Sequence, residues 1–343
     1  MKSGRIVVAL WLLLFATTAA TAAAALTIAI TGTTGKLGRR AIQLLSSRGI
    51  ATRCLLRHPI TNATDNNLLL PNISALNDDT ASSSTVASYL SQLPHVTMVY
   101  GDATNLQSCH DLVNGCDAIL ALHGPARPPP LQSLFRRLPE SHPLHSRSVN
   151  YVAVQNIITA CRASRTCTRI VRVTGKGEQP TQLFTVLINM LGHMAKAWNY
   201  EGEQLLRTSG LEYTIVRPGV MRSVGNTNNN DDDDDMIIPK DGVLALADNG
   251  GDLPMSSVSH TQIASLCIDC LNYPNTAQST ITVMNVPPGT GEVSYGPLLA
   301  KVRKDTRSFP PTLLEQHKKA ARTGAVALCA FLTVIVTGLL MLI

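Results

Sequence analysis

Short apolar runs alternate with amphipathic stretches over most of the chain. The runs predict strands, which we expect over residues 26–31, 52–56, 96–100, 118–122, 169–174 and 213–216. Apolar positions three and four residues apart predict helices over residues 39–48, 106–114, 148–163 and 187–207. Strands that alternate with helices require right-handed crossovers, so the pattern predicts an α/β fold with a doubly wound parallel sheet and a small C-terminal portion.

Three segments interrupt this pattern. Residues 61–93 are rich in Asn, Ser and Thr, residues 125–145 contain three consecutive prolines, and residues 226–235 end in five aspartates. Consecutive carboxylates lack the spacing and the turn of a calcium loop. We therefore interpret the aspartate run as a solvated loop and expect no metal site.

The two ends of the chain carry membrane signals. Lys2 and Arg5 precede an apolar run and then small residues up to Ala25, which is the layout of a secretory signal peptide; an uncleaved signal anchor over residues 1–25 is the alternative. Residues 323–343 carry no charge, and a helix of this length would measure about 31 Å, the thickness of a bilayer core. The sequence predicts a folded domain over residues 26–305, a basic linker over residues 306–322 and a transmembrane helix over residues 323–343.

The signals disagree on the orientation of the domain. Basic residues crowd the domain side of the predicted anchor, which favours a cytosolic domain. A cleaved signal and the sequons at Asn62 and Asn72 favour a lumenal domain. Because the N-terminal segment inserts first, we expect a single-pass protein of the secretory pathway or endomembranes, with a plastid membrane as the alternative.

Composition narrows the classes of function. Charged residues are 15% of the chain, and 29 Lys and Arg against 23 Asp and Glu give a formal net charge of +6. The basic residues are scattered and aromatic residues are only 4%, so we expect no nucleic-acid partner. The eight cysteines match neither a disulfide scaffold nor a zinc site, and we interpret most of them, including Cys267 and Cys270, as buried packing residues.

The strongest motif follows the first predicted strand, in the order Gly32, Thr33, Thr34, Gly35, Lys36, Leu37, Gly38. Gly32 permits the tight turn, Gly35 lets the backbone approach a pyrophosphate, and Gly38 lets the next helix pack closely. The N-terminus of that helix would face the phosphates, so the motif predicts a dinucleotide site.

The end of the second predicted strand selects the cofactor. An NAD site normally has Asp or Glu here to bind the ribose hydroxyls, whereas this strand is followed by Arg57. A guanidinium suits a 2′-phosphate, so we predict NADP rather than NAD. A solvated surface arginine is the alternative.

The glycine motif and Arg57 form an ordered set with Gly101-Asp102, the helix over 149–158 and the segments 203–219 and 258–264. The set resembles the atypical short-chain dehydrogenase/reductases of the NAD(P)-binding, NmrA-like kind over residues 26 to about 305. The resemblance implies a Rossmann-like fold and oxidoreductase activity. It also implies that Asp102 and Ala103 face the adenine, that Leu122, His123 and Gly124 line the cofactor, that Thr174 holds the position of the active-site hydroxyl, and that Arg217-Pro218-Gly219 borders the nicotinamide pocket.

One departure from the family concerns catalysis. Short-chain dehydrogenases use Tyr-x-x-x-Lys, in which the lysine lowers the pKa of the tyrosine. Ala195 and Asn199 hold those two positions here. Lys196 and Tyr200 share a helical face in the reverse order, so we predict them, with Thr174, as the catalytic groups; an ordinary amphipathic helix end is the alternative.

We therefore expect a membrane-tethered NADP(H)-binding oxidoreductase that acts on a small or lipophilic molecule. The rival is a non-catalytic redox sensor or assembly factor that uses the bound dinucleotide to control a protein partner. A working proton donor separates these two functions. A third role, in glycan or protein interaction on the lumenal face, rests only on the two sequons.

Overall fold

The computed structural model describes residues 26–57, 82–125, 138–222, 243–287, 291 and 294–340. The predicted signal, both sequons and the aspartate run lie outside the described residues, as do parts of the other two predicted insertions.

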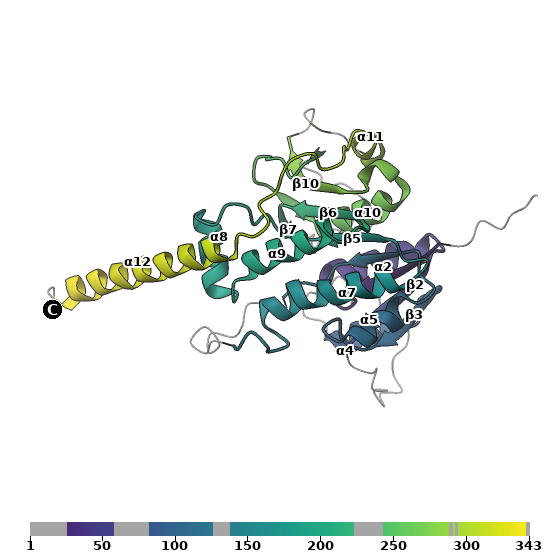
Figure 1. The fold of residues 1–343 in the computed structure, drawn as a ribbon, viewed down its shortest axis with the longest axis horizontal. Helices are drawn as coiled ribbons and strands as arrows, with labels where there is room; N and C mark the ends of the chain where they lie inside the picture. The colour runs from purple at the N-terminus through teal and green to yellow at the C-terminus, as the bar shows by residue number, and fades with distance from the viewer. Residues whose placement is uncertain are drawn as a thin grey trace, which may run out of the picture.

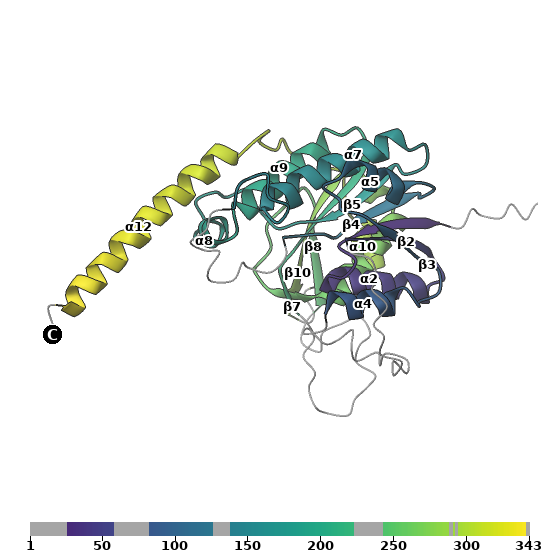
Figure 2. The same ribbon diagram turned by 90° about the horizontal axis from the view of Figure 1, so that it is seen from below.

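An eight-stranded sheet with the order β3-β2-β1-β4-β5-β6-β10-β8 runs through the molecule (Figures 1 and 2). Its strands are β1 (Thr27–Thr31), β2 (Ala51–Leu56), β3 (Val96–Tyr100), β4 (Ala118–Ala121), β5 (Arg169–Val173), β6 (Glu212–Pro218), β8 (Val243–Ala247) and β10 (Ser279–Val286). All neighbours are parallel except β8, which is antiparallel to β10. The predicted doubly wound sheet is confirmed. A second, two-stranded sheet pairs β7 (Val220–Arg222) with β9 (Ser257–Ser259).

Helices cover both faces of the sheet, as Figure 2 shows. One face carries α2 (Lys36–Ser47), α4 (Ser83–Leu90) and α10 (His260–Asp269); the other carries α5 (Leu106–Val113), α7 (Ala153–Ala163) and α9 (Ala195–Arg207). Successive side chains of a strand point to opposite faces. In β1, Ile28 and Ile30 accordingly join one apolar cluster while Ala29 joins the other. The remaining short elements are the π-helical turn η1 (Ser148–Val152), the 3₁₀ turns η2 (Cys270–Asn272) and η3 (Pro274–Thr276), and α11 (Tyr295–Ala300).

The helix predicted over residues 187–207 is two helices, α8 (Leu183–Leu191) and α9. His193 and Met194 lie between them with φ values of 50° and 63°, a left-handed conformation that ends the first helix. The side chain of Asn189 then accepts hydrogen bonds from the N–H groups of Lys196 and Ala197 at 3.0 and 3.2 Å. These bonds satisfy two of the free donors at the start of α9.

The chain ends in α12 (Leu314–Leu340), a helix that extends away from the body (Figures 1 and 2). Most of the predicted basic linker is therefore either helix or a segment that packs on the body. Within the residues whose side chains are described, which leave out 332, 336 and 338–343, no helix is long and apolar enough to cross a membrane. The transmembrane helix predicted over residues 323–343 is not found among those residues.

Seven of the eight cysteines are buried and free, as predicted for packing residues, and Cys329 is free and exposed. Cys267 lies in α10 and Cys270 in the turn that follows it, and burial raises the pKa of both thiols. Neither thiol therefore has the lowered pKa of a redox-active cysteine.

Candidate cofactor and catalytic site

The glycine turn after β1 has no room for side chains at two positions. Gly32 has a φ of +78°, and a Cβ there would lie 2.7 Å from the backbone nitrogen of His123. A Cβ on Gly38 would overlap the carbonyl oxygen of Gly32. The turn is tied to the sheet by Thr33, whose hydroxyl donates a hydrogen bond to the carbonyl of Leu55 at 2.6 Å.

The N-terminus of α2 is open to solvent. Its cap residue Gly35 is exposed, no side chain caps the helix, and the first turn carries no acidic residue. A Cβ on Gly35 would meet only the carbonyl oxygen of Gly32, at 3.2 Å. Uncapped N–H groups and the positive end of the helix dipole bind phosphate well. The geometry therefore fits a pyrophosphate at this turn.

The predicted cofactor residues gather at the carboxyl ends of the parallel strands. The order of the strands reverses between β1 and β4, and ligands of open α/β sheets bind outside the carboxyl ends of the strands at such a point. The glycine turn follows β1, while Leu122, His123 and Gly124 follow β4. Arg57 follows β2 and Asp102 follows β3, so the topology places both at the same carboxyl end of the sheet. Pro218 ends β6 and lies farther along this end of the sheet.

Arg57 and Asp102 differ in what they contact. Arg57 is exposed, and its guanidinium makes no hydrogen bond or ion pair within the described part of the chain. Asp102 instead closes a local turn, because its carboxylate accepts hydrogen bonds from the N–H and the hydroxyl of Thr104 at 2.8 and 2.7 Å. The carbonyl of Ala103 accepts a bond from Asn156 at 3.0 Å. Of these two side chains, Arg57 is therefore the one whose polar group is available to bind a ligand without first breaking a hydrogen bond within the described residues.

His123, which is half-buried, is held by two hydrogen-bond partners. Its Nε2 lies 3.1 Å from the guanidinium of Arg172, which can only donate, so Nε2 accepts. Its Nδ1–H then donates to the hydroxyl of Thr31 at 2.6 Å. Burial, followed by the charge of Arg172, lowers the pKa of His123 to about 3. His123 is therefore neutral near pH 7 and supplies no proton there.

Arg172 is a residue that the sequence analysis missed. It is fully buried in β5, where its guanidinium also donates to the carbonyl of Asn150 and to the side chain of Asn199, both at 3.3 Å. An arginine inside the apolar run of residues 170–173 is the signal that could have found it. Its hydrogen bonds hold His123 and Asn199 at the carboxyl end of the central strands.

Thr174 and Glu203 form the second buried network. The hydroxyl of Thr174 donates to Glu203 at 2.7 Å, and the carboxylate of Glu203 also accepts from Arg217 and Arg207. Although burial alone would raise it, the two guanidinium groups hold the pKa of Glu203 at about 2. Thr174, predicted as the active-site hydroxyl, has its proton committed to this carboxylate.

The two predicted catalytic residues of α9 point to different places. Tyr200 is only 1% exposed, and its hydroxyl donates to the carbonyl of Pro310 at 2.6 Å. The ammonium of Lys196 lies over the ring of Phe184, 5.6 Å from its centroid, and 2.7 Å from where a Cβ on Gly175 would stand. Gly175 follows the carboxyl end of β5, so the ammonium of Lys196 reaches the carboxyl end of the sheet, whereas the hydroxyl of Tyr200 is bonded to Pro310.

A segment between α11 and α12 closes the outer side of these networks. The ring of Phe309 packs on the guanidinium groups of Arg207, Arg307 and Arg217, at 3.7, 4.5 and 5.9 Å. At the start of α12, the ring of His317 bridges the carbonyl of Gly177 and the side chain of Asn189, at 2.8 and 2.9 Å. The C-terminal segment therefore contacts the loop after β5 as well as α8 and α9.

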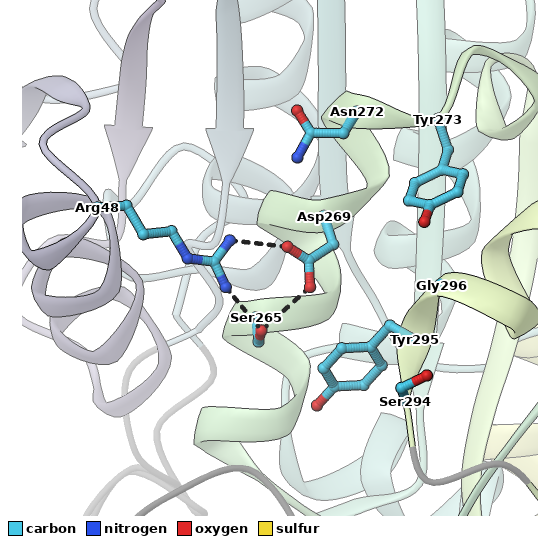
Figure 3. Close-up of a pocket in the computed structure, with 8 residues that line it drawn as sticks. All are labelled: Arg48, Ser265, Asp269, Asn272, Tyr273, Ser294, Tyr295 and Gly296. Carbon is cyan, nitrogen blue, oxygen red and sulfur yellow. Dashed lines mark hydrogen bonds and ion pairs between the residues drawn. The ribbon is translucent and has the colours of Figure 1, made fainter.

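A pocket of about 640 Å³ lies at the opposite end of the sheet, where the parallel strands begin (Figure 3). Arg48, at the end of α2, pairs there with Asp269 at 2.7 Å and donates to Ser265. The other lining residues are Asn272, Tyr273, Ser294, Tyr295 and Gly296. Because α2 ends near the amino end of β2, this pocket is separate from the predicted cofactor residues, which lie at the carboxyl ends of the strands.

Comparison with known proteins agrees with this fold. A family model described as NAD(P)H-binding matches residues 80–274, more than half of the chain. Sanguinarine reductase of Eschscholzia californica is 26% identical over 110 residues, which are 31% of this chain and 36% of that protein, so the chain matches about a third of that relative's length.

Solved structures show the same fold. Two crystal structures of a short-chain dehydrogenase/reductase from Veillonella parvula, one ethylated and one in complex with NADP, each have a TM-score of 0.50 and 14% identity. Both alignments cover 78% of this chain, and they cover 97% and 98% of the solved chains. The match to the family model agrees with the resemblance inferred from the sequence: this chain belongs to the NAD(P)H-binding family.

Proposed function

We propose that the protein is an NADP(H)-dependent reductase of a small or lipophilic carbonyl compound. The observation that carries the proposal is the open N-terminus of α2 beside the glycine turn, with the exposed Arg57 at the end of the neighbouring strand. The turn would hold the pyrophosphate, and Arg57 would bind the 2′-phosphate that distinguishes NADP from NAD. The relative named as a reductase supports the reaction class.

Lys196 is the proton donor in this proposal. NADPH, when bound, supplies the hydride that reduces the carbonyl carbon, and the carbonyl oxygen then needs a proton. Burial lowers the pKa of Lys196 from its ordinary value, which makes its ammonium a better acid. Tyr200 is unsuited in this conformation because its proton is bonded to Pro310 and burial raises its pKa to about 12.

The test is NADPH oxidation, followed at the NADPH absorption band, by the full chain with a panel of carbonyl compounds. We expect turnover by the unchanged protein and none by Gly35→Val, whose side chain would occupy the phosphate position. Tight NADPH binding without turnover on any carbonyl compound would contradict the reductase.

A sensor is the second candidate, and one observation favours it. The hydroxyls of Thr174 and Tyr200 are both committed to other groups, so neither can act on a substrate in this conformation. A sensor needs the same dinucleotide site but no donor. NADPH would then change the binding of a protein partner, and Lys196→Met would leave that change intact.

We also propose that the uncharged part of α12 anchors the chain in an endomembrane, with the domain in the lumen. Support comes from the sequence, which has no charge after Arg322, and from the exposure of Val326, Phe331 and Val334 in the helix. The test is the protection of the whole domain from protease in sealed microsomes, with loss of a glycan in the Asn62→Gln/Asn72→Gln variant. Digestion of the domain in intact vesicles would show the opposite orientation.

A further inference from the structure

The helix α8 exposes a stripe of large apolar side chains. Leu183 is 73% exposed, and Phe184, Leu187 and Leu191 are 40–49% exposed. Their spacing places the four on one side of the helix, while Thr185, Val186 and Asn189 are buried. From residue 179 to residue 195 the sequence holds no Asp, Glu, Lys or Arg. Four neighbouring apolar side chains at an exposed surface indicate an interaction site.

The position of α8 along α12 indicates what covers this stripe. A Cβ on Gly324 would lie 2.5 Å from Val186 and 3.2 Å from the sulfur of Met190, so the two helices pack closely at that residue. Gly324 is the second residue of the uncharged part of α12, which begins at Thr323. Both ribbon views place α8 at the end of the body from which α12 extends (Figures 1 and 2). The stripe thus lies at the level where α12 changes from charged to apolar.

Basic residues stand at the same level. Lys319 and Arg322 are exposed in the last turn of α12 before Thr323, and Lys318 pairs with the exposed Glu315 at 2.9 Å. A basic cluster directly before an apolar helix segment is complementary to anionic lipid headgroups. Apolar side chains beside such a cluster are typical of helices that lie in the interface of a membrane.

We propose that the four-residue stripe of α8 rests on the surface of an anionic lipid bilayer beside the point where α12 enters it. The inference relies on the proposed anchoring of α12 but not on the cofactor or the reaction. It adds a second contact, which fixes the domain against the membrane. Phe184 then lies at the bilayer surface with Lys196 above it, so a lipophilic substrate could reach the donor directly from the membrane.

The test places a tryptophan in the stripe. The full-length Leu183→Trp variant is mixed with anionic vesicles that contain brominated lipid, and its emission is compared with that of the unchanged chain. The matched control is Leu106→Trp, because Leu106 is also an exposed apolar residue but belongs to α5. We expect strong quenching and a blue shift for Leu183→Trp, and neither for Leu106→Trp.

The outcomes separate the two membrane proposals. If the chain binds the vesicles but both variants are quenched equally, the α8 contact is overturned and the α12 anchor still stands. Chain that does not sediment with the vesicles would overturn both. A dimer of the purified chain that Leu187→Glu dissociates, with no quenching of Leu183→Trp, would assign the stripe to a second copy instead.

Discussion

The hydroxyl of Tyr200 donates its proton to the carbonyl of Pro310 at 2.6 Å, and this bond joins the helix α9 to the segment that leads into α12. The same segment is bound by Glu201, which accepts hydrogen bonds from the hydroxyl of Thr312 and the N–H of Leu313 at 2.8 and 3.0 Å. Tyr200 therefore acts as an attachment point for the C-terminal segment in this structure.

Removal of the Tyr200 hydroxyl should consequently cost stability and not catalysis. Tyr200→Phe keeps the ring and loses one buried hydrogen bond, so we expect a loss of about 1 kcal/mol in the free energy of unfolding, with kcat nearly unchanged. Lys196→Met should have the opposite effect, because loss of a proton donor lowers the rate by about 10²- to 10⁴-fold. Steady-state kinetics and chemical unfolding of both variants measure this difference. A large fall in kcat for Tyr200→Phe would restore tyrosine as the donor.

Glu203 should be among the most sensitive positions of the fold. It is 0% exposed and pairs with both Arg217 and Arg207, so Glu203→Gln would remove the buried carboxylate that these two guanidinium groups share and leave them with Glu178 and Asp305. We expect a loss of about 3–5 kcal/mol in the free energy of unfolding, or failure to accumulate as folded protein. The matched control is Glu315→Gln at the exposed pair with Lys318, which should leave stability unchanged. Equal effects of the two substitutions would show that the buried network does not stabilise the fold.

The parallel sheet could be predicted because each of its first six strands is a local apolar run bounded by turn residues. The last two strands could not be assigned in the same way. β10 lies beside β6 only after a long detour of the chain, and β8 joins the sheet through β10 in the antiparallel direction. Pairings between such distant segments leave no periodic pattern in the sequence. The break between α8 and α9 depends on the left-handed backbone of His193 and Met194, and the preceding Gly192, which caps α8, is its signal in the sequence.

The cofactor turn could likewise be predicted, since Gly32 and Gly38 are required by contacts within one short motif. The catalytic side was harder to infer. Helical spacing puts Lys196 and Tyr200 on one face, but partners from elsewhere decide where each side chain goes: Phe184 for the lysine and Pro310 for the tyrosine. The hydrogen bond of Thr174 also depends on a helix far along the chain.

Stability should fall as the pH drops below about 6.5. The pKa of His123 is about 3 in the fold against an ordinary value of 6.5, so between these values the unfolded chain binds a proton that the folded chain does not. Glu203, whose pKa falls from 4.5 to about 2, continues the loss in more acidic solution. Burial also lowers the pKa of His145, His193 and His317, which act in the same direction.

The contribution of His123 can be isolated by substitution. His123→Gln retains hydrogen-bonding groups but cannot take up the proton, so its Tm should fall less steeply than that of the unchanged chain between about pH 6.5 and pH 4.5. Thermal unfolding at several pH values measures both slopes. Identical slopes would mean that His123 does not stay neutral in the fold.

Arg57 should set the preference for NADPH over NADH. A charge-assisted contact to the 2′-phosphate is worth about 1.5–3 kcal/mol, so Arg57→Ala should weaken NADPH binding by about 10- to 100-fold and leave NADH binding unchanged. Arg48→Ala is the control, since Arg48 lies at the opposite end of the sheet, in the pocket of Figure 3. Equal Kd values of the unchanged protein for the two cofactors would remove this role from Arg57.

Two glycines of the turn should respond differently to substitution. Gly32→Ala forces a Cβ against the backbone of His123 in a left-handed conformation, so it should destabilise the fold itself. Gly35 has an ordinary φ of −70°, and a Cβ there would contact only the carbonyl oxygen of Gly32, at 3.2 Å, so Gly35→Val should destabilise the fold much less than Gly32→Ala. Its side chain would nevertheless fill the space beside the N-terminus of α2.

Calorimetric titration of NADPH into the full chain and into Gly35→Val, together with the Tm of each protein, tests the dinucleotide site most directly. The predicted result is saturable binding by the unchanged chain and no measurable binding by Gly35→Val, at nearly the same Tm. Binding of equal affinity by the two proteins, or no binding by the unchanged chain, would contradict a cofactor site at this turn.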